Sequence, residues 1–172
     1  HKEYGIKNLC LAGGVALNCV ANGKILKEKI FENIWIQPAA GDAGGALGAA
    51  LALWYIEQGN TRIINPNDSM NGSYLGSEYS QDQIEKELLS IGANFETLNY
   101  ENLIDQTSEY LSNKKAIGWF QGRMEFGPRA LGGRSIIGDP RSEKMQKNLN
   151  LKVKYRESFR PFAPSILYED LS

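Results

Sequence analysis

Arginine side chains are concentrated in a short, glycine- and proline-rich segment of this chain. Of its seven arginines, six lie between Arg123 and Arg160, and four of these fall within residues 122–141. A guanidinium is a planar, permanently charged fork that binds phosphate or carboxylate oxygens in pairs. Glycine lets a backbone approach a ligand closely, and proline fixes the shape of a loop. The segment therefore predicts a pocket for a polyanion on which the six guanidiniums converge.

Two acidic residues lie among these arginines. Repulsion between the guanidiniums must be offset either by a bound anion or by Glu125 and Asp139. Glu125 could act as a base, but pairing with a neighbouring arginine is the expected role because the local charge is so positive. We find no Ser-His-Asp or Cys-His arrangement that would indicate hydrolysis by a protein nucleophile.

The charge of the chain is distributed unevenly, although the formal net charge is only -1. Residues 67–113 hold nine acids and one base, whereas residues 116–165 hold ten Lys/Arg and four acids. The acidic residues have the spacing of solvated helix faces. The basic residues lie among glycine, proline and aromatic residues, which favours a binding site over a solvated surface.

Composition describes an ordinary soluble globular protein. The chain has 172 residues, of which 42% are hydrophobic and 23% charged, enough for one domain or two small ones. No run reaches the roughly 18 apolar residues of a membrane span, and no signal-peptide pattern is visible. Cys10 and Cys19 lack metal-site spacing, so both are predicted to be reduced core residues, which favours a cytoplasmic location.

Hydrophobic periodicity predicts an α/β fold. In the first 60 residues we expect a buried strand over 7–12, a helix over 15–29, a strand over 33–37 and a helix over 43–58. The last helix should turn four apolar side chains inward: Leu47, Leu51, Trp54 and Tyr55. This βαβα order implies parallel strands. After an irregular linker, we expect helices over 80–91, 102–113 and 142–151, with strands over 95–98, 116–120 and 164–168.

Glycine-rich loops follow the first two predicted strands. Gly13 and Gly14 could turn backbone N–H groups toward an anion, with Asn18 one turn further along as a hydrogen-bonding partner. A tight turn without ligand is an equally good explanation. In the second loop, Asp42 is placed to bind a metal ion or to cap the following helix. Loops at the ends of adjacent parallel strands converge, which raises the case for a ligand at both.

Two long motifs make the sequence recognisable. LAGGVALNCVANGKI (11–25), followed by QPAAGDAGGALGAAL (37–51), resembles the carbamoyltransferase family of nodulation and antibiotic O-carbamoyltransferases. GWFQGRMEFGPRALGGRSIIGDPR (118–141), with FRPFAPSIL (159–167), resembles the carboxyl-terminal domain of the same family. The resemblance covers most of the chain and is absent only from the linker and the acidic helices that follow it.

The resemblance implies two partial modules. Residues 1–60 would be the carboxyl-terminal part of an actin/Hsp70/sugar-kinase-like module, shared with the enzyme that places threonylcarbamoyl on tRNA. Residues 61–76 would be a linker, and residues 77–172 the amino-terminal part of a YrdC-like domain. The YrdC-like domain would form a carbamoyl-adenylate from carbamoyl phosphate and ATP. The first module would then transfer the carbamoyl group to a hydroxyl of a sugar or another small biosynthetic acceptor.

The resemblance also implies roles for individual residues. The phosphates or the carbamoyl group would be bound by six basic residues: Arg123, Arg129, Arg134, Arg160, Lys152 and Lys154. The nucleotide pocket of the first module would contain Gly13, Gly14, Asn18, Gly41 and Gly44. Asp42 would bind a divalent metal, Mg or Fe. Fixed positive charge suits this reaction, because attack on ATP brings two anions together.

The chain departs from the family pattern in ways that indicate a fragment. The family binds its metal partly through upstream histidines, and here the single histidine is His1. We therefore expect the chain alone to be inactive and the missing remainder of the parent protein to be a partner.

Two alternatives compete with a carbamoyl-transfer site. An RNA-binding module would use the aromatic residues that alternate with basic ones, namely Trp119, Phe120, Phe126, Tyr155, Phe159 and Phe162. Core packing is the expected role of Trp119 and Phe120, and nucleic acid is not the expected partner. Alternatively, the basic loop could contact the rest of the parent protein.

Overall fold

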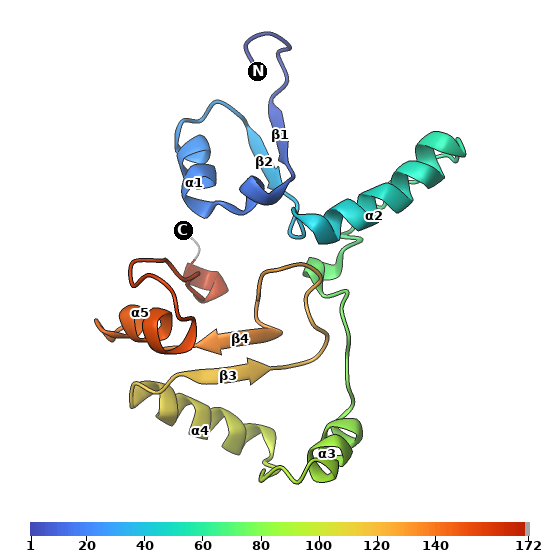
Figure 1. Ribbon diagram of the computed structural model, residues 1–172. Coiled ribbons are helices and arrows are strands. Elements are labelled where there is room, and N and C mark those ends of the chain that lie inside the picture. Colours follow the sequence, from blue (N-terminus) through green and yellow to red (C-terminus); the bar gives the residue numbers. More distant parts are fainter. Residues whose placement is uncertain (171–172) are drawn as a thin grey trace. The chain divides into compact units, whose positions relative to one another are not determined.

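The computed structural model describes residues 1–170, which form two compact units (Figure 1). Unit 1 comprises residues 1–79 and 121–133, and unit 2 comprises residues 80–120 together with the chain from Arg134 onward. The arginine-rich segment is thus divided, because residues 121–133 belong to the unit that contains the glycine-rich loops. The domain boundaries expected at residues 60 and 77 stay a prediction.

Unit 1 contains a parallel strand pair, as predicted from the βαβα pattern. β1 (Asn8–Leu11) pairs with β2 (Asn33–Ile36), with Asn8 opposite Asn33 and Leu11 opposite Ile36. The chain between them forms a 3₁₀ turn and then α1 (Cys19–Lys27). Residues along both strands alternate between exposed and half-buried. The expectation of a buried first strand is therefore wrong, because no residue of β1 is fully buried.

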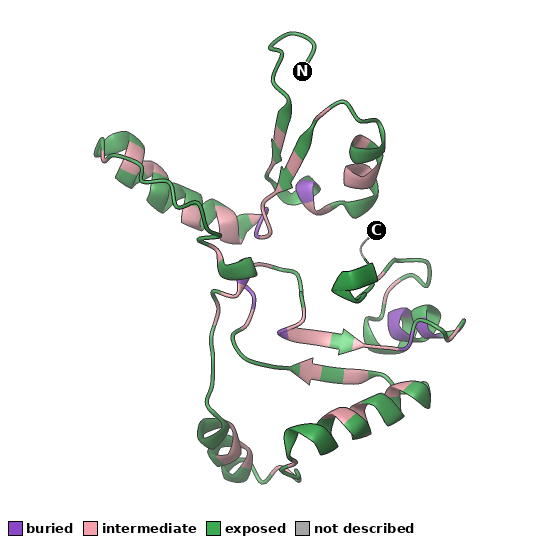
Figure 2. Cartoon of the chain, turned by 180° about the vertical axis from the view of Figure 1, so that it is seen from behind, coloured by how far each residue is buried: buried purple, intermediate pink, exposed green. Residues whose placement is uncertain are grey.

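α2 (Asp42–Ala52) begins after Gly41 and continues into a π-helical turn over Leu53–Glu57. Its alanine-rich sequence favours helix, and Gly59, with a φ of 67°, ends it. Figures 1 and 2 show α2 extending away from the two strands. None of its residues is buried, and Leu51 and Trp54 are 45% and 52% exposed. The predicted inward orientation is therefore wrong for Leu51 and Trp54, whereas Leu47 and Tyr55 are half-buried.

Unit 2 begins with two capped helices. α3 (Gln81–Ser90) has Ser80 as its N-cap in a capping box with Gln83, and α4 (Tyr100–Ser112) is capped by Asn99. Both helices were predicted, but the strand predicted over 95–98 is wrong. That segment forms the connection between the two helices, where it has no strand to pair with.

β3 (Ile117–Phe120) and β4 (Arg134–Ile137) form an antiparallel pair in unit 2. The helix predicted over 142–151 appears as α5 (Met145–Asn148) followed by a π-helical turn, Leu149–Val153. The strand predicted over 164–168 is wrong, because this stretch has no regular structure until the 3₁₀ turn at Tyr168–Asp170.

Within residues 1–170, few apolar side chains are buried (Figure 2). The buried ones are Ala16, Ala39, Ala40, Met145 and Leu149. Cys10 and Cys19 are free thiols, but both are exposed, so their predicted place in a core is wrong. Phe120 is 47% exposed, which also contradicts its predicted core packing. No helix in the described part of the chain has the length and apolar character needed to cross a membrane.

Candidate functional site: an arginine loop held by polar side chains

Residues 121–133, hereafter the arginine loop, connect β3 to β4 and are hydrogen-bonded to residues 73–78. Gly76 N donates to Met124 O at 2.8 Å, and Met124 N donates to Ser77 O at 2.9 Å. Ser73 forms a two-way contact with Phe126, accepting from its N–H at 2.7 Å and donating Oγ–H to its carbonyl at 2.9 Å. The loop therefore has a fixed path despite its irregular backbone.

Glu125 lies inside the arginine loop and is only 3% exposed. Its Oε1 accepts hydrogen bonds from the backbone N–H groups of Leu131, at 2.6 Å, and Gly133, at 2.7 Å. Tyr74 closes the same turn from outside by donating its hydroxyl to Leu131 O at 2.8 Å. The carboxylate thus accepts the backbone hydrogen bonds that carbonyl groups accept in a helix or a sheet.

The arginine loop also touches the second glycine-rich loop. Gly127 has a φ of 112°, and a Cβ placed on it would lie 3.0 Å from Ala39 Cα. A β-carbon on Gly44 would overlap the carbonyl oxygen of Ala39. Gly13 N donates to Ala40 O at 2.7 Å, so both glycine-rich loops and the arginine loop meet at Ala39 and Ala40.

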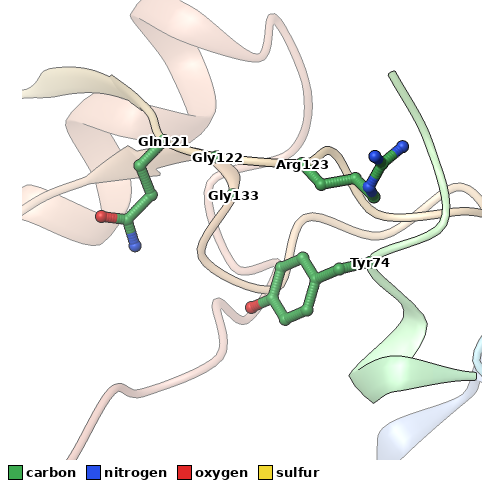
Figure 3. Close-up of a pocket in the computed structure, with 5 residues that line it drawn as sticks. All are labelled: Tyr74, Gln121, Gly122, Arg123 and Gly133. Carbon is green, nitrogen blue, oxygen red and sulfur yellow. The ribbon is translucent and has the colours of Figure 1, made fainter. Parts of the chain in front are cut away.

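A shallow hollow of about 480 Å³ lies against the base of the arginine loop (Figure 3). Its lining residues are Tyr74, Gln121, Gly122, Arg123 and Gly133. Figure 3 shows the Gln121 and Arg123 side chains leaving the loop in different directions. Gln121 N donates to Gly133 O at 2.9 Å, which closes the base of the loop.

The two arginines of the loop differ in their contacts. Arg123 donates to Gly76 O at 2.7 Å and forms an ion pair with Glu78 at 2.8 Å. Arg129 is exposed, and within residues 1–170 its guanidinium has no hydrogen bond or ion pair. Of this pair, Arg129 therefore offers the unoccupied positive charge.

In unit 2, arginines form ion pairs with nearby acids. Arg141 binds Asp139 through Nε and a terminal nitrogen at 2.8–3.1 Å, and this lowers the pKa of the Asp139 carboxyl. Arg160 donates to Glu157 at 2.7 Å and lowers the pKa of that carboxyl in the same way. The expectation that acids offset the arginine charge is confirmed for Asp139.

A buried asparagine organises the turn that carries Arg160. Asn150 is fully buried, and its amide nitrogen donates to Ser158 O at 3.1 Å and to Arg160 O at 2.8 Å. Its Oδ1 accepts from Arg156 Nε at 2.6 Å. The guanidinium of Arg156 also lies 5.0 Å from the ring centroid of Phe162, a cation–π contact.

The remaining predicted basic residues are in unit 2. Arg134 is the half-buried first residue of β4, and Lys152 and Lys154 are exposed at the π-helical turn after α5. The predicted basic set is therefore split, with Arg123 and Arg129 in one unit and the other four in the other. Convergence of all six guanidiniums on one pocket stays a prediction.

Local geometry accounts for several residues assigned to a nucleotide pocket. The Gly13 amide is bonded to Ala40, and Gly44 allows contact with Ala39. Asn18 is the N-cap of α1, since its Oδ1 accepts from Ala21 N at 3.1 Å. Gly41 is the N-cap of α2. Their role in binding a nucleotide stays a prediction.

Asp42 is the first residue of α2, where its charge faces the positive end of the helix. The N-cap residue is Gly41, so the alternative prediction that Asp42 caps this helix is wrong. Among residues 1–170 no group of three or more His, Cys, Asp or Glu side chains is arranged to hold a metal ion. The residues present do not fit a complete divalent metal site.

The sequence did not identify Asn150, Ser73 or Tyr74 as organising residues. Each side chain donates a hydrogen bond to a backbone carbonyl 8 to 57 positions away along the chain. The local sequence pattern therefore gives no indication of these contacts. Glu125 was identified, and its pairing with an arginine stays a prediction, but its bonds to backbone amides were not foreseen. Its position inside a glycine-rich turn, where backbone amides lack partners, was the available clue.

Comparison with known families now identifies the class of protein. A model described as "Carbamoyltransferase N-terminus" matches residues 1–51, and one described as "Carbamoyltransferase C-terminus" matches residues 108–172. The chain belongs to the carbamoyltransferase family, as its motifs predicted.

Its relatives include an uncharacterised protein of Synechocystis, 58% identical over 98% of this chain and 28% of the relative. Nodulation protein NolNO of Sinorhizobium fredii is 47% identical over 99% of this chain and 25% of its own length. Nodulation protein NolO of Bradyrhizobium diazoefficiens is 45% identical over 99% of this chain and 31% of its own length. The chain thus spans about a quarter to a third of the curated relatives that it matches.

Proposed function

We propose that this chain is part of a longer O-carbamoyltransferase that uses carbamoyl phosphate and ATP and serves a hydroxyl of a sugar or another small molecule. The main support is the presence of both family models in order along one chain. A fixed, arginine-bearing loop that contacts the glycine-rich loops adds structural support.

The reaction that we propose balances as follows. Carbamoyl phosphate is hydrolysed to carbamate and phosphate, and a carbamate oxygen attacks the α-phosphorus of ATP. The bond to pyrophosphate breaks and leaves carbamoyl-adenylate. The acceptor hydroxyl then attacks the carbamoyl carbon, AMP departs, and the hydroxyl proton passes to water. Arg129 suits the first steps because its exposed guanidinium can bind phosphate oxygens and offset the charge that two anions bring together.

The exposed apolar residues support the view that the chain is one part of a larger protein. Leu53, Trp54 and Ile56 are 55%, 52% and 75% exposed along the α2 extension. Large apolar side chains exposed together on one short helical segment often contact other protein. We infer that the parent protein covers these side chains, and that any metal held by Asp42 takes its other ligands from there.

The test is isotope exchange from labelled pyrophosphate into ATP, which needs no knowledge of the acceptor. In the full-length parent, we expect exchange that requires carbamoyl phosphate and is lost in Arg129→Ala and Arg134→Ala, with Lys27→Ala as the exposed control. The chain alone should give none. Robust exchange by the chain alone would refute the fragment proposal, and its absence from the parent would refute adenylate formation.

An RNA-binding module remains the second candidate, because Tyr155 and Phe159 are 85% and 76% exposed beside Arg156 and Arg160. Exposed aromatic rings next to arginines suit stacking on bases. RNA binding would show an affinity that falls linearly with salt on logarithmic axes. If RNA does not bind, or binds with an affinity that salt does not change, the RNA-binding alternative is refuted.

A further inference from the structure

We propose that Glu125 is a positioning residue that fixes Arg129 for its anionic substrate, and that its carboxylate is not a base. The kinetic part of this proposal rests on the proposed carbamoyltransferase function, whereas the structural part does not.

Glu125 Oε1 closes a ring of backbone around Arg129. The bond to Leu131 N, at 2.6 Å, encloses the five intervening residues 126–130, with Arg129 fourth among them. The second bond, to Gly133 N at 2.7 Å, holds the far side of the turn to the same oxygen. Bonds from amides to a carboxylate are stronger than those between neutral groups, so one side chain can order this turn.

The remainder of the turn keeps Glu125 in place. Its neighbours Met124 and Phe126 are both bonded to the 73–78 segment. Gly133 lets the carboxylate approach, since a Cβ there would lie 3.3 Å from Glu125 Oε2 and 2.9 Å from Arg123 O. Glu125 therefore cannot shift without breaking contacts on both sides.

Arg129 is the residue that this arrangement presents. It is exposed at the turn, and in residues 1–170 its guanidinium has no hydrogen bond or ion pair, whereas Arg123 is held by Glu78. Holding a long side chain at a defined origin reduces the entropy lost when it binds an oxyanion. The ring that Glu125 closes therefore acts on the substrate through Arg129.

Two substitutions separate positioning from base chemistry. Glu125→Gln keeps an oxygen that can accept both amide bonds but removes the charge and the basic site, whereas Glu125→Ala removes the acceptor. In the full-length parent, we expect Glu125→Ala to lower kcat/KM for carbamoyl phosphate about tenfold or more, mainly through KM. Glu125→Gln should stay within about threefold of wild type, and exposed Glu143→Gln should match it; a tenfold loss corresponds to about 1.4 kcal/mol.

A double-mutant cycle tests whether Glu125 acts through Arg129. In an Arg129→Ala background, the further loss from Glu125→Ala should shrink to about twofold or less, since coupled residues are not additive. If Glu125→Ala fails to fold, Glu125→Asp, which withdraws the oxygen by one methylene, takes its place in the cycle. Additive losses, or a Gln variant as inactive as the Ala variant, would overturn the proposal.

Amide hydrogen exchange supplies a readout that needs no activity. We expect faster exchange at Leu131 and Gly133 in Glu125→Ala, or in Glu125→Asp if that variant replaces it. Glu125→Gln and Glu143→Gln should exchange much as wild type does. Unchanged exchange at these two amides would overturn loop closure by Glu125. The parent could show no carbamoyl-dependent chemistry while amide hydrogen exchange at Leu131 and Gly133 rises as expected. In that case the proposed function fails, but the closure of the loop by Glu125 stands.

Discussion

The two arginine-bearing regions of this molecule are organised by opposite kinds of contact. In unit 1, Glu125 accepts from two backbone amides, and the Arg129 guanidinium makes no bond within residues 1–170. In unit 2, Asp139, Glu157 and Asn150 receive hydrogen bonds from arginine side chains themselves. The turn around Arg129 is thus held through its backbone and leaves that guanidinium available, although Arg123 in the same unit pairs with Glu78. In unit 2, the guanidiniums of Arg141, Arg156 and Arg160 bind side chains of their own turns.

This difference separates binding arginines from structural ones. A guanidinium that already donates to a carboxylate must exchange that partner for a ligand, so much of the gain on binding is cancelled. Arg141 and Arg160 are in this state, as is Arg123 through Glu78. We therefore expect Arg129 to contribute more to anion binding than any of these three.

The largest expected effect concerns the residue that anchors the unit 2 turn. Asn150→Ala should lower the free energy of unfolding by about 2–4 kcal/mol, because two carbonyls and the Arg156 side chain lose a buried partner. Asn150→Asp should be at least as harmful, since a carboxylate oxygen would face the carbonyls of Ser158 and Arg160. Urea denaturation of the protein measures both, with Asn148→Ala, an exposed residue at the end of α5, as control.

Asn150 also tests the contrast with unit 1 directly. Hydrogen exchange in Asn150→Ala should rise near Arg156 and Arg160 and stay unchanged at Leu131 and Gly133. A rise at both places would show that the two turns form one cooperative unit, which contradicts their separate organisation.

Two glycines of unit 1 give an intermediate effect with opposite signs. Gly127→Ala should destabilise by about 1–3 kcal/mol, because its φ of 112° suits glycine and a Cβ would press on Ala39. Gly45→Ala, in α2, meets no atom within 4 Å and should stabilise by about 0.5–1 kcal/mol. Paired melting curves measure the difference. Equal shifts would mean that the contact at Ala39 does not constrain the arginine loop.

Regular elements of the fold could be predicted from the sequence, whereas the contacts that build the site could not. α3 and α4 follow from local signals, the cap at Ser80 and apolar spacing, and the parallel strands follow from the βαβα order. The strand predicted over 95–98 failed because a strand needs a partner, which no local pattern supplies.

The site itself divides in the same way. Arg129 was visible as part of a basic, glycine-rich motif, but the bonds from Ser73 and Tyr74 join segments more than 50 positions apart. Burial predictions for Cys10, Leu51 and Trp54 failed for a related reason. Apolar character marks a side chain that favours burial, but within residues 1–170 these three side chains stay exposed.

The smallest expected effect is a difference in acid sensitivity between Asp68 in unit 1 and Asp139 in unit 2. Backbone amides of Gly72 and Met70 lower the pKa of Asp68, whereas the Arg141 guanidinium lowers that of Asp139. A carboxyl whose pKa is lower in the folded state than in the unfolded state stabilises the protein when the pH is above the unfolded-state pKa. That stability declines as the pH falls below 3.8 and is gone below the folded-state pKa.

Salt distinguishes the two aspartates. The side chain of Arg141 is 76% exposed, so added salt should screen its pairing with Asp139 and weaken the acid-dependent loss attributable to that residue. The contribution of Asp68 depends on short bonds to neutral amides and should change little. Acid titrations of the unfolding midpoint for Asp68→Asn and Asp139→Asn, at low and high salt, measure this. An equal salt response would contradict the distinction between Asp68, which is bonded to backbone amides, and Asp139, which is paired with an arginine side chain.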